Sequence, residues 1–164
     1  MVWIAFHYVL WWLWLNRNVR NEIKKGKKIY FYDNGIRNAV LGNFLPLSSR
    51  MDTGALWENF LISERHKFLV NKDIEAQRYF WRITQQQEIN YIEELDSRLF
   101  AFEFKWNPAR KPFLSKTFAN AYPLSEFQVI SPENLHLFLT ETLQKKEQWY
   151  SEKVEQWNGD WVTR

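Results

Sequence analysis

The chain has 164 residues and a formal net charge of only +3, with 22 Lys and Arg residues against 19 Asp and Glu residues. This length fits one domain that is large enough to bury a substantial core. The absence of cysteine excludes a disulfide scaffold and a thiolate metal site, and it agrees with the cytoplasmic location that we expect.

The first predicted element is an apolar run, Val2 to Leu15, that only His7 interrupts. As a helix, this run would span about 21 Å, which is short of the ~30 Å hydrocarbon core of a membrane. Its Trp, Ile, Val, Phe and Tyr residues favour one or two buried strands instead. The run could pack on the chain's own sheet, on a partner or second copy, or less favourably on a membrane surface. We expect self-association through residues 1–15, and a more soluble domain after their deletion.

A cluster of positive residues follows the apolar run, with Glu22 as its one acid. We interpret this cluster as a surface that contacts phosphates, with DNA as the expected partner and RNA or acidic lipid as alternatives. A solvated hairpin tip without a ligand is the other interpretation. The residues assigned to nucleic-acid binding are Arg17, Arg20, Lys24, Lys25, Lys27 and Lys28.

The rest of the chain alternates predicted helices and strands. A short strand is expected over residues 29–32, and the first helix begins near Gly35 with Asp33 or Asn34 as its cap. The second helix runs from Gly54 to about Val70, after a cap at Asp52 or Thr53. Three strands, a short helix, a strand and a last helix follow, over residues 78–83, 88–94, 99–106, 114–121, 126–130 and from 131 onward.

This order predicts a mixed sheet with flanking helices, in the α/β class at its border with α+β. We divide the chain into an aromatic and basic N-terminal segment (1–27), one folded domain (28–143) and a charged C-terminal helix or tail (144–164). No GxxxxGK[ST] motif is present, so no Walker-type nucleotide site is expected. The three histidines are far apart in the sequence and do not predict a metal site.

The chain is organised around the hairpin 88–106, whose turn is Leu95-Asp96-Ser97-Arg98. Strand periodicity places Phe100, Phe102, Phe104 and Trp106 on one face of its second strand, and Leu99, Ala101, Glu103 and Lys105 on the other. In the first strand, the same periodicity groups Glu88, Asn90, Ile92 and Glu94. If these faces coincide, a single patch collects the side chains of Glu88, Asn90, Glu103 and Lys105.

Such a patch has a chemical interpretation, because Mg²⁺ prefers one or two carboxylates together with water and a substrate phosphate. A lysine two residues from a ligand carboxylate can hold the attacking water and stabilise charge on the phosphate. Glu103-Phe104-Lys105 fits this pattern. An ion pair on a half-solvated strand remains the alternative. Glu58, one turn before Leu61 and Ile62 on the second helix, is either a further site acid or a solvated carboxylate.

Several segments resemble the uncharacterised C-terminal domain of a family of prokaryotic AAA-type ATPases, over roughly residues 16 to 140. These segments are residues 28–38, 54–61, 81–82 with 88–91, and 102–105. The resemblance implies a PD-(D/E)XK nuclease-like, restriction-endonuclease-like fold attached to an ATPase module, with Mg²⁺ as the cofactor. It places the helix acid at Glu58, the acid of the central hairpin at Asn90, and the ExK pair at Glu103 and Lys105. We expect these four side chains to share one pocket.

The sequence departs from the family pattern at Asn90, where Asp is expected. An amide can offer its carbonyl oxygen to Mg²⁺ but supplies no charge, so metal affinity and catalysis should fall, with Glu88 as a partial substitute. The expected metal ligands are Glu58, Glu88, Asn90 and Glu103. The ATPase portion is not part of this chain, which suggests a truncated gene product.

Three functions are therefore open at this point. The first is a nuclease-fold domain that binds nucleic acid or its partner ATPase, with weak or lost catalysis. The second is an active Mg²⁺-dependent DNA endonuclease that uses Glu58, Glu88, Glu103 and Lys105. The third is a protein-interaction module without catalysis.

Overall fold

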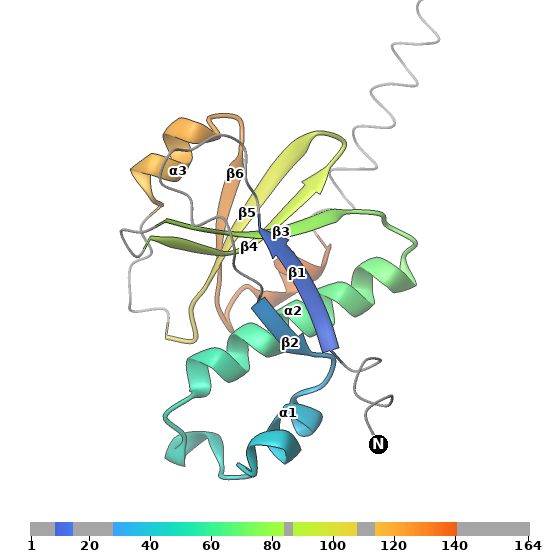
Figure 1. Ribbon diagram of the computed structural model, residues 1–164, viewed down its shortest axis with the longest axis vertical. Helices are drawn as coiled ribbons and strands as arrows, with labels where there is room; N and C mark the ends of the chain where they lie inside the picture. The colour runs from blue at the N-terminus through green and yellow to red at the C-terminus, as the bar shows by residue number, and fades with distance from the viewer. Residues whose placement is uncertain (1–8, 15–27, 84–86, 108–113, 141–164) are drawn as a thin grey trace, which may run out of the picture.

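The computed structural model describes residues 28–83, 87–107 and 114–140, together with the backbone of residues 9–14 (Figure 1). The elements follow the predicted order and form a mixed sheet with flanking helices. They are β1 (Val9–Trp14), β2 (Lys28–Phe31), α1 (Asn34–Leu41), the 3-10 turn η2 (Leu47–Ser49), α2 (Thr53–Asn71), β3 (Gln77–Arg82), β4 (Glu88–Leu95), β5 (Arg98–Phe104), α3 (Lys116–Ala121), β6 (Glu126–Ile130) and a helical stretch over residues 135–140.

The sheet has six strands in the order β2-β1-β3-β4-β5-β6. Strand β1 lies inside it, antiparallel to β2 and parallel to β3. Strands β3, β4 and β5 form an antiparallel meander, and β6 runs parallel to β5. The backbone pairing of β1 favours the first alternative for the apolar run, which is packing on the chain's own sheet. The remaining residues of that run, 2–8 and 15, lie outside the described residues. Within the described ranges, no helix has the length and apolarity needed to cross a membrane.

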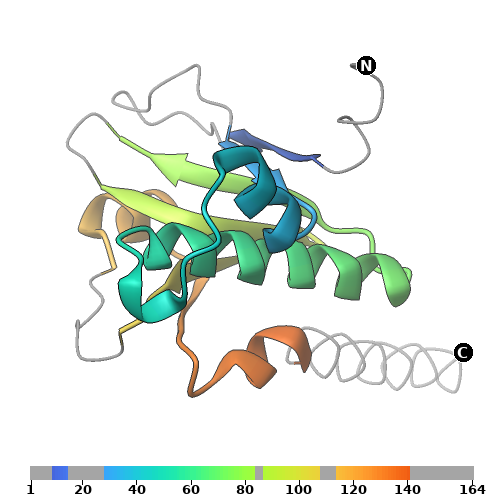
Figure 2. The same ribbon diagram turned by 90° about the horizontal axis from the view of Figure 1, so that it is seen from below.

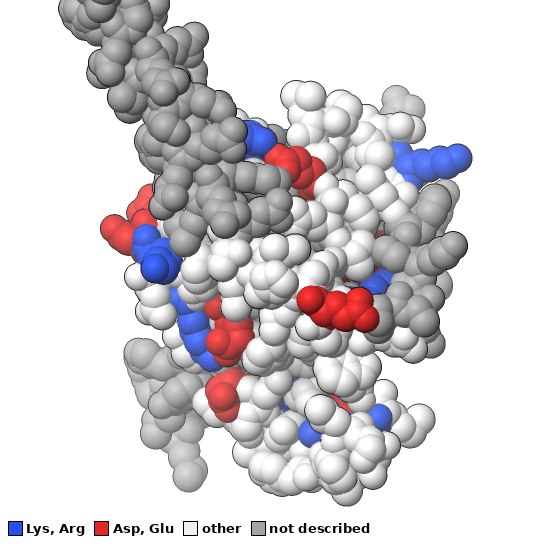
Figure 3. All heavy atoms as spheres, turned by 180° about the vertical axis from the view of Figure 1, so that it is seen from behind, with Lys and Arg blue, Asp and Glu red and all other residues white. Residues whose placement is uncertain are grey.

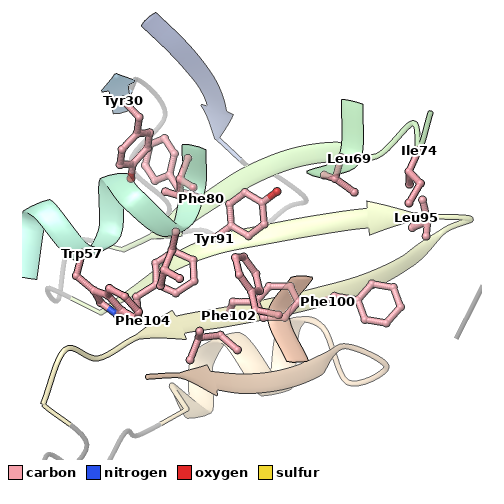
Figure 4. Packing of buried hydrophobic residues seen from close by; sticks show 14 residues of the cluster. Tyr30, Trp57, Leu69, Ile74, Phe80, Tyr91, Leu95, Phe100, Phe102 and Phe104 are labelled. Atoms are coloured by element: carbon pink, nitrogen blue, oxygen red, sulfur yellow. The ribbon is translucent and has the colours of Figure 1, made fainter. Parts of the chain in front are cut away.

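Helix α2 covers one face of the sheet, and α3 lies against the other (Figures 1 and 2). On the α2 face, Phe100, Phe102 and Phe104 of β5 pack with Leu61 and Ile62 of α2. Figure 4 shows Phe102 and Phe104 near Tyr91, with Phe100 farther along the sheet. On the α3 face, Leu99 and Ala101 of β5 pack with Ile89 and Ile92 of β4 and with residues of α3. The predicted alternation of β5 is therefore confirmed.

The alternation of β4, in contrast, is interrupted by a β-bulge. Tyr79 pairs with Ile92 but Trp81 pairs with Ile89, so two residues of β4, Asn90 and Tyr91, lie opposite the single residue between them on β3. A bulge of this kind turns the side chains on one side of it to the other face of the sheet. Ile89 and Ile92 accordingly share the α3 face. The prediction that Glu88, Asn90, Ile92 and Glu94 share one face is wrong for this reason.

The predicted side-chain cap is present at the start of α1, whereas the side chain of Asp52 does not cap α2. The Asp33 carboxylate accepts hydrogen bonds from the backbone N–H groups of Gly35 and Ile36 at the start of α1, as predicted. Asp52 precedes α2, but its side chain makes no cap hydrogen bond. It accepts hydrogen bonds from Arg37 and Arg50 instead, each at 2.9 Å. The guanidinium groups replace the backbone N–H groups as partners of this carboxylate.

Candidate functional site

Lys28 is the centre of a charged cluster at the junction of β2, α2 and β4. Its Nζ atom lies 2.9 Å from Glu58 Oε1 and also donates to Glu88 Oε1. Burial alone would lower the pKa of Lys28, but the carboxylates of Glu58 and Glu88 raise it above its ordinary value of 10.5. Lys28 is therefore a cation that two acids share.

The position of Lys28 changes the predicted basic surface. This lysine was assigned to phosphate contacts, whereas its ammonium group is directed at carboxylates. Arg17, Arg20, Lys24, Lys25 and Lys27 lie outside the described residues. On the face shown in Figure 3, the described Lys and Arg side chains are scattered among Asp and Glu side chains and form no continuous basic surface.

Protein donors engage both oxygens of the Glu58 carboxylate. Oε1 accepts hydrogen bonds from Lys28 and from the Tyr30 hydroxyl at 2.5 Å, and Oε2 accepts one from Asn90 Nδ2 at 3.1 Å. Figure 4 shows the Tyr30 side chain beside Phe80 with its hydroxyl directed toward α2. Burial raises the pKa of Tyr30 far above its ordinary value of 10.0, and the neighbouring Glu58 raises it further. Tyr30 is thus a fixed donor to Glu58.

Asn90 uses both ends of its amide within the protein. Its Nδ2 donates to Glu58, and its Oδ1 accepts a hydrogen bond from the backbone N–H of Phe104 at 3.0 Å. The paired register of β4 and β5 ends at Tyr91 and Phe102, so this amide bridges the two strands just beyond the end of their ladder. The bulge turns Asn90 toward α2, where it contacts Glu58. The amide oxygen that was expected to bind Mg²⁺ instead accepts a hydrogen bond from the neighbouring strand.

Glu103 and Lys105 form an ion pair beside this cluster, with Lys105 Nζ 2.8 Å from Glu103 Oε1. Burial raises the pKa of Glu103, and the carboxylates of Glu88 and Glu58 also raise it, against the opposing effect of Lys105. Glu103 is therefore within electrostatic range of both other acids. The strand alternation of β5, however, groups Glu103 with Leu99 and Ala101 rather than with the residues that face α2.

The predicted site residues are thus brought together in part. Lys28 joins Glu58 to Glu88, while Asn90 and Tyr30 each donate to Glu58. We call these five residues the carboxylate cluster. Glu103 and Lys105 stand next to it as a separate pair. Sequence reasoning missed the roles of Lys28 and Tyr30, although their spacing of two residues on a strand predicts one shared face.

The charges around the cluster balance without a metal ion. The carboxylates of Glu58, Glu88 and Glu103 are matched by Lys28, by Lys105 and by Arg82, whose Nε lies 3.6 Å from Glu88 Oε2. Among the described residues, no group of three or more His, Asp or Glu side chains is placed to hold a metal. The donors on Glu58, the ammonium group between two acids and the engaged Asn90 oxygen do not fit the Mg²⁺ site that the resemblance implies.

A second charged cluster joins the other half of α2 to β4, and we call it the buried ion pair. Arg65 Nε and Nη2 donate to the two oxygens of Glu93, each at 2.6 Å, and neither side chain is exposed. Tyr91 also donates to Glu93, at 2.7 Å, and Arg65 donates to the backbone carbonyl of Phe138. This network connects α2, β4 and the 135–140 helix.

Comparison with known proteins gives one family and two relatives. The family described as a domain of unknown function (DUF4143) matches residues 53–150, a range that includes Glu58, Glu88, Asn90, Glu103 and Lys105. Uncharacterized protein Rv2008c of Mycobacterium tuberculosis and uncharacterized protein Mb2031c of Mycobacterium bovis are each 26% identical over 131 residues. The match covers 77% of this chain but only 28% of the length of these curated relatives. No solved structure matches.

Proposed function

The chain belongs to the DUF4143 family of domains of unknown function, and from that premise we propose that it is a nuclease-fold domain that binds a partner without cleaving phosphodiester bonds. The order of α2, the β3–β5 meander, α3 and β6 supports this proposal, because a mixed sheet with flanking helices is what the resemblance to PD-(D/E)XK nuclease-like domains implies. The acids that the resemblance assigns lie near one another, at the end of the β4–β5 ladder.

The observation that carries the proposal is the position of Lys28. Its ammonium group lies between Glu58 and Glu88 and supplies the positive charge that a divalent cation would supply to these two acids. Asn90 adds a neutral amide where a carboxylate is expected, and this amide donates to Glu58. The domain therefore carries its own cation within the group of acids.

A catalytic Mg²⁺ ion would have to displace this arrangement. The ion loses its bound water reluctantly and requires near-octahedral oxygen ligands. To reach Glu58, it would have to replace the hydrogen bonds from Lys28, Tyr30 and Asn90, and the displaced ammonium group would remain beside it as a like charge. These costs support a loss of catalysis rather than an active endonuclease.

The proposal includes an ATPase module as the natural neighbour of the domain in longer proteins. The resemblance to the C-terminal domain of AAA-type ATPases supports this association. The relatives in mycobacteria are long enough to include such a module, because the matched region is 28% of their length. Binding to that module or to nucleic acid then replaces catalysis as the role of the domain.

A plasmid cleavage assay in Mg²⁺ or Mn²⁺ tests the loss of catalysis. The wild-type chain should nick supercoiled DNA no faster than Glu103→Gln, which removes one acid and keeps the shape. The double variant Lys28→Met with Asn90→Asp, which removes the internal cation and adds a carboxylate, is the one in which cleavage should appear. Robust cleavage by the wild-type chain that Lys105→Ala abolishes would establish the active endonuclease instead.

A further inference from the structure

Strand β2 lies at the edge of the sheet, so one row of its backbone groups faces no neighbouring strand (Figure 1). At Phe31, Asn59 of α2 supplies the missing partners. The Phe31 N–H donates to Asn59 Oδ1 at 2.8 Å, and Asn59 Nδ2 donates to the Phe31 carbonyl at 3.0 Å. At this residue, one side chain of α2 thus takes the place of the next strand.

Further hydrogen bonds fix the orientation of the Asn59 amide. Its Nδ2 also donates to Asn34 Oδ1 at 2.8 Å, and Asn34 Nδ2 donates to the Leu56 carbonyl at 3.2 Å. Asn59 is only 3% exposed. A side-chain amide carries a donor and an acceptor side by side, which is what the N–H and C=O of one residue require. A buried polar network with all its members paired is rigid, so this amide attaches β2 firmly to α2.

The attachment also sets the register of β2 against α2. Successive residues of a strand direct their backbone groups to opposite edges and their side chains to opposite faces. A slip of β2 by one residue would therefore turn the backbone groups away from Asn59 and turn Lys28 and Tyr30 away from Glu58. Glu58 and Asn59 are neighbours on α2, and they bind the side chains and the backbone of the same strand.

The hydrogen bonds of Asn59 are better shielded from water than the ion pair of Lys28. The side chains of Lys28 and Glu58 are each 22% exposed, and partly exposed pairs contribute little on their own to holding two elements together. Pairing with β1 joins β2 to the sheet but involves no residue of α2. The buried amide is therefore the contact that determines whether the Lys28 ammonium reaches its two acids.

We propose that Asn59 is the positioning residue that keeps the Lys28 ammonium between Glu58 and Glu88, and that release of β2 from Asn59 opens these two acids to a divalent cation from solution. This role of Asn59 rests on the proposed function and names the contact that regulates the same site. The position of Lys28 is measured without metal, so each proposal can fail without the other.

Two-dimensional NMR of the Lys28 ammonium group in the full, metal-free chain tests the positioning role. An ammonium group that donates to carboxylates exchanges its protons slowly with water and gives a ¹H–¹⁵N signal, which is assigned to Lys28 by its absence in Lys28→Met. The wild-type chain should show this signal. In Asn59→Ala, proton exchange of the group should accelerate about tenfold or more, because two buried backbone hydrogen bonds are lost.

Two further variants separate positioning from a general loss of stability. Ser63→Ala is the matched control, because Ser63 is also buried on α2, one turn beyond Asn59, and its hydroxyl donates to the Phe60 carbonyl of the same helix. It should keep the Lys28 signal. Asn34→Ala removes the acceptor that orients the Asn59 amide and should accelerate exchange by a smaller factor. This milder variant decides the test if Asn59→Ala does not fold, which amide-exchange protection of β4 and β5 reports.

Calorimetric titration with Mn²⁺ tests whether release opens the acids. Asn59→Ala should bind Mn²⁺ saturably, whereas Ser63→Ala should not. Binding should be weaker than in the double variant Lys28→Met with Asn90→Asp, because the lysine charge remains nearby and Asn90 stays neutral.

The positioning role would be overturned by a wild-type chain without a slowly exchanging Lys28 signal. Unchanged exchange in a folded Asn59→Ala, or in Asn34→Ala where Asn59→Ala does not fold, would also overturn it, as would equal acceleration in Ser63→Ala. Release of Lys28 without Mn²⁺ binding would overturn the opening of the acids. Mn²⁺ binding by the wild-type chain would count against the proposed function, while the Lys28 signal would still decide the role of Asn59.

Discussion

The buried ion pair and the carboxylate cluster both join α2 to β4, but they are built differently. Arg65 and Glu93 meet one to one, through two parallel hydrogen bonds, with no exposed surface on either side chain. In the carboxylate cluster, one lysine serves two glutamates, and the side chains of Lys28, Glu58 and Glu88 are 22%, 22% and 28% exposed. The buried ion pair is closed to water, and the carboxylate cluster is partly open to it.

On our proposal, this difference separates a structural network, the buried ion pair, from a candidate site, the carboxylate cluster. A fully buried, matched pair cannot exchange its partners without exposing an uncompensated charge, so it fixes how α2, β4 and the 135–140 helix lie together. The side chains of Lys28, Glu58 and Glu88 in the carboxylate cluster are partly exposed, so a ligand from solution can reach their charges. On our proposal, the domain thus combines a rigid frame with a charged cluster in which Lys28 supplies the positive charge between two acids.

The largest effect should follow from breaking the buried ion pair. Glu93→Gln keeps the shape of the side chain but leaves the Arg65 charge buried without its counterion, which should cost about 3–5 kcal/mol of the free energy of unfolding. Urea denaturation measures this loss. The control is Glu64→Gln, which breaks the more exposed pair of Glu64 and Lys67 on the same helix and should cost about 0.5 kcal/mol or less. Similar losses in the two variants would mean that burial does not distinguish these pairs.

A local effect should follow from deleting residues 1–15, because β1 supplies the pairing that attaches β2 to the rest of the sheet. Lys28 and Tyr30 on β2 should then lose their contacts with Glu58, while the buried ion pair, which includes no residue of β1 or β2, persists. Amide hydrogen exchange should show lost protection in β2 and retained protection in β4 and β5. Unchanged protection of β2 after the deletion would support the expectation that the chain without residues 1–15 is a more soluble domain.

Lys28→Met should lower the free energy of unfolding moderately, and a divalent cation should restore part of the loss. The variant leaves Glu58 and Glu88 without their shared cation, in a partly exposed site, so the loss should lie between that of an exposed pair and that of a buried one, at about 1–2 kcal/mol. Mn²⁺ should restore part of this stability, since a ligand that binds only the folded state stabilises it. Thermal unfolding with and without Mn²⁺ checks both statements, with the wild-type chain as the control that Mn²⁺ leaves unchanged.

The smallest effect on stability concerns Glu103. Burial raises the pKa of this carboxyl above its ordinary value of 4.5, and repulsion from Glu88 and Glu58 also raises it. A pKa that is higher in the folded chain means that the folded state binds the proton more tightly. This contribution stabilises the fold fully below the unfolded pKa and is lost as the pH rises through the folded pKa. Urea midpoints measured from about pH 4 to pH 7 should therefore decline less for Glu103→Gln than for the wild-type chain. Parallel curves of urea midpoint against pH for the two proteins would contradict a raised pKa of Glu103 in the folded chain.

The sequence predicted those parts of the fold that depend on local patterns. The alternation of Phe100, Phe102 and Phe104 against Leu99 and Ala101 identified both faces of β5, and Asp33 identified the start of α1. Each of these signals lies within a few neighbouring residues, where periodicity and capping chemistry decide the structure. The order of helices and strands followed from such signals.

The site was harder to predict because its contacts join distant residues. Lys28 meets acids that are 30 and 60 positions away, and nothing in the basic run that contains Lys28 distinguishes it from the other lysines. The bulge at Asn90 is equally hidden, since the sequence around it continues an ordinary strand pattern while the pairing with β3 inserts an extra residue. Both features depend on which strands become neighbours in the sheet.

The most direct test of the central claim is a calorimetric titration of the metal-free chain with Mn²⁺. We expect no saturable binding by the wild-type chain below about 1 mM, because Lys28 and the Asn90 amide already engage the carboxylates. The double variant Lys28→Met with Asn90→Asp should bind measurably, since it removes one positive charge and adds one negative charge beside Glu58. Submillimolar binding by the wild-type chain that Glu58→Gln and Glu103→Gln both abolish would contradict the claim that the domain supplies its own cation.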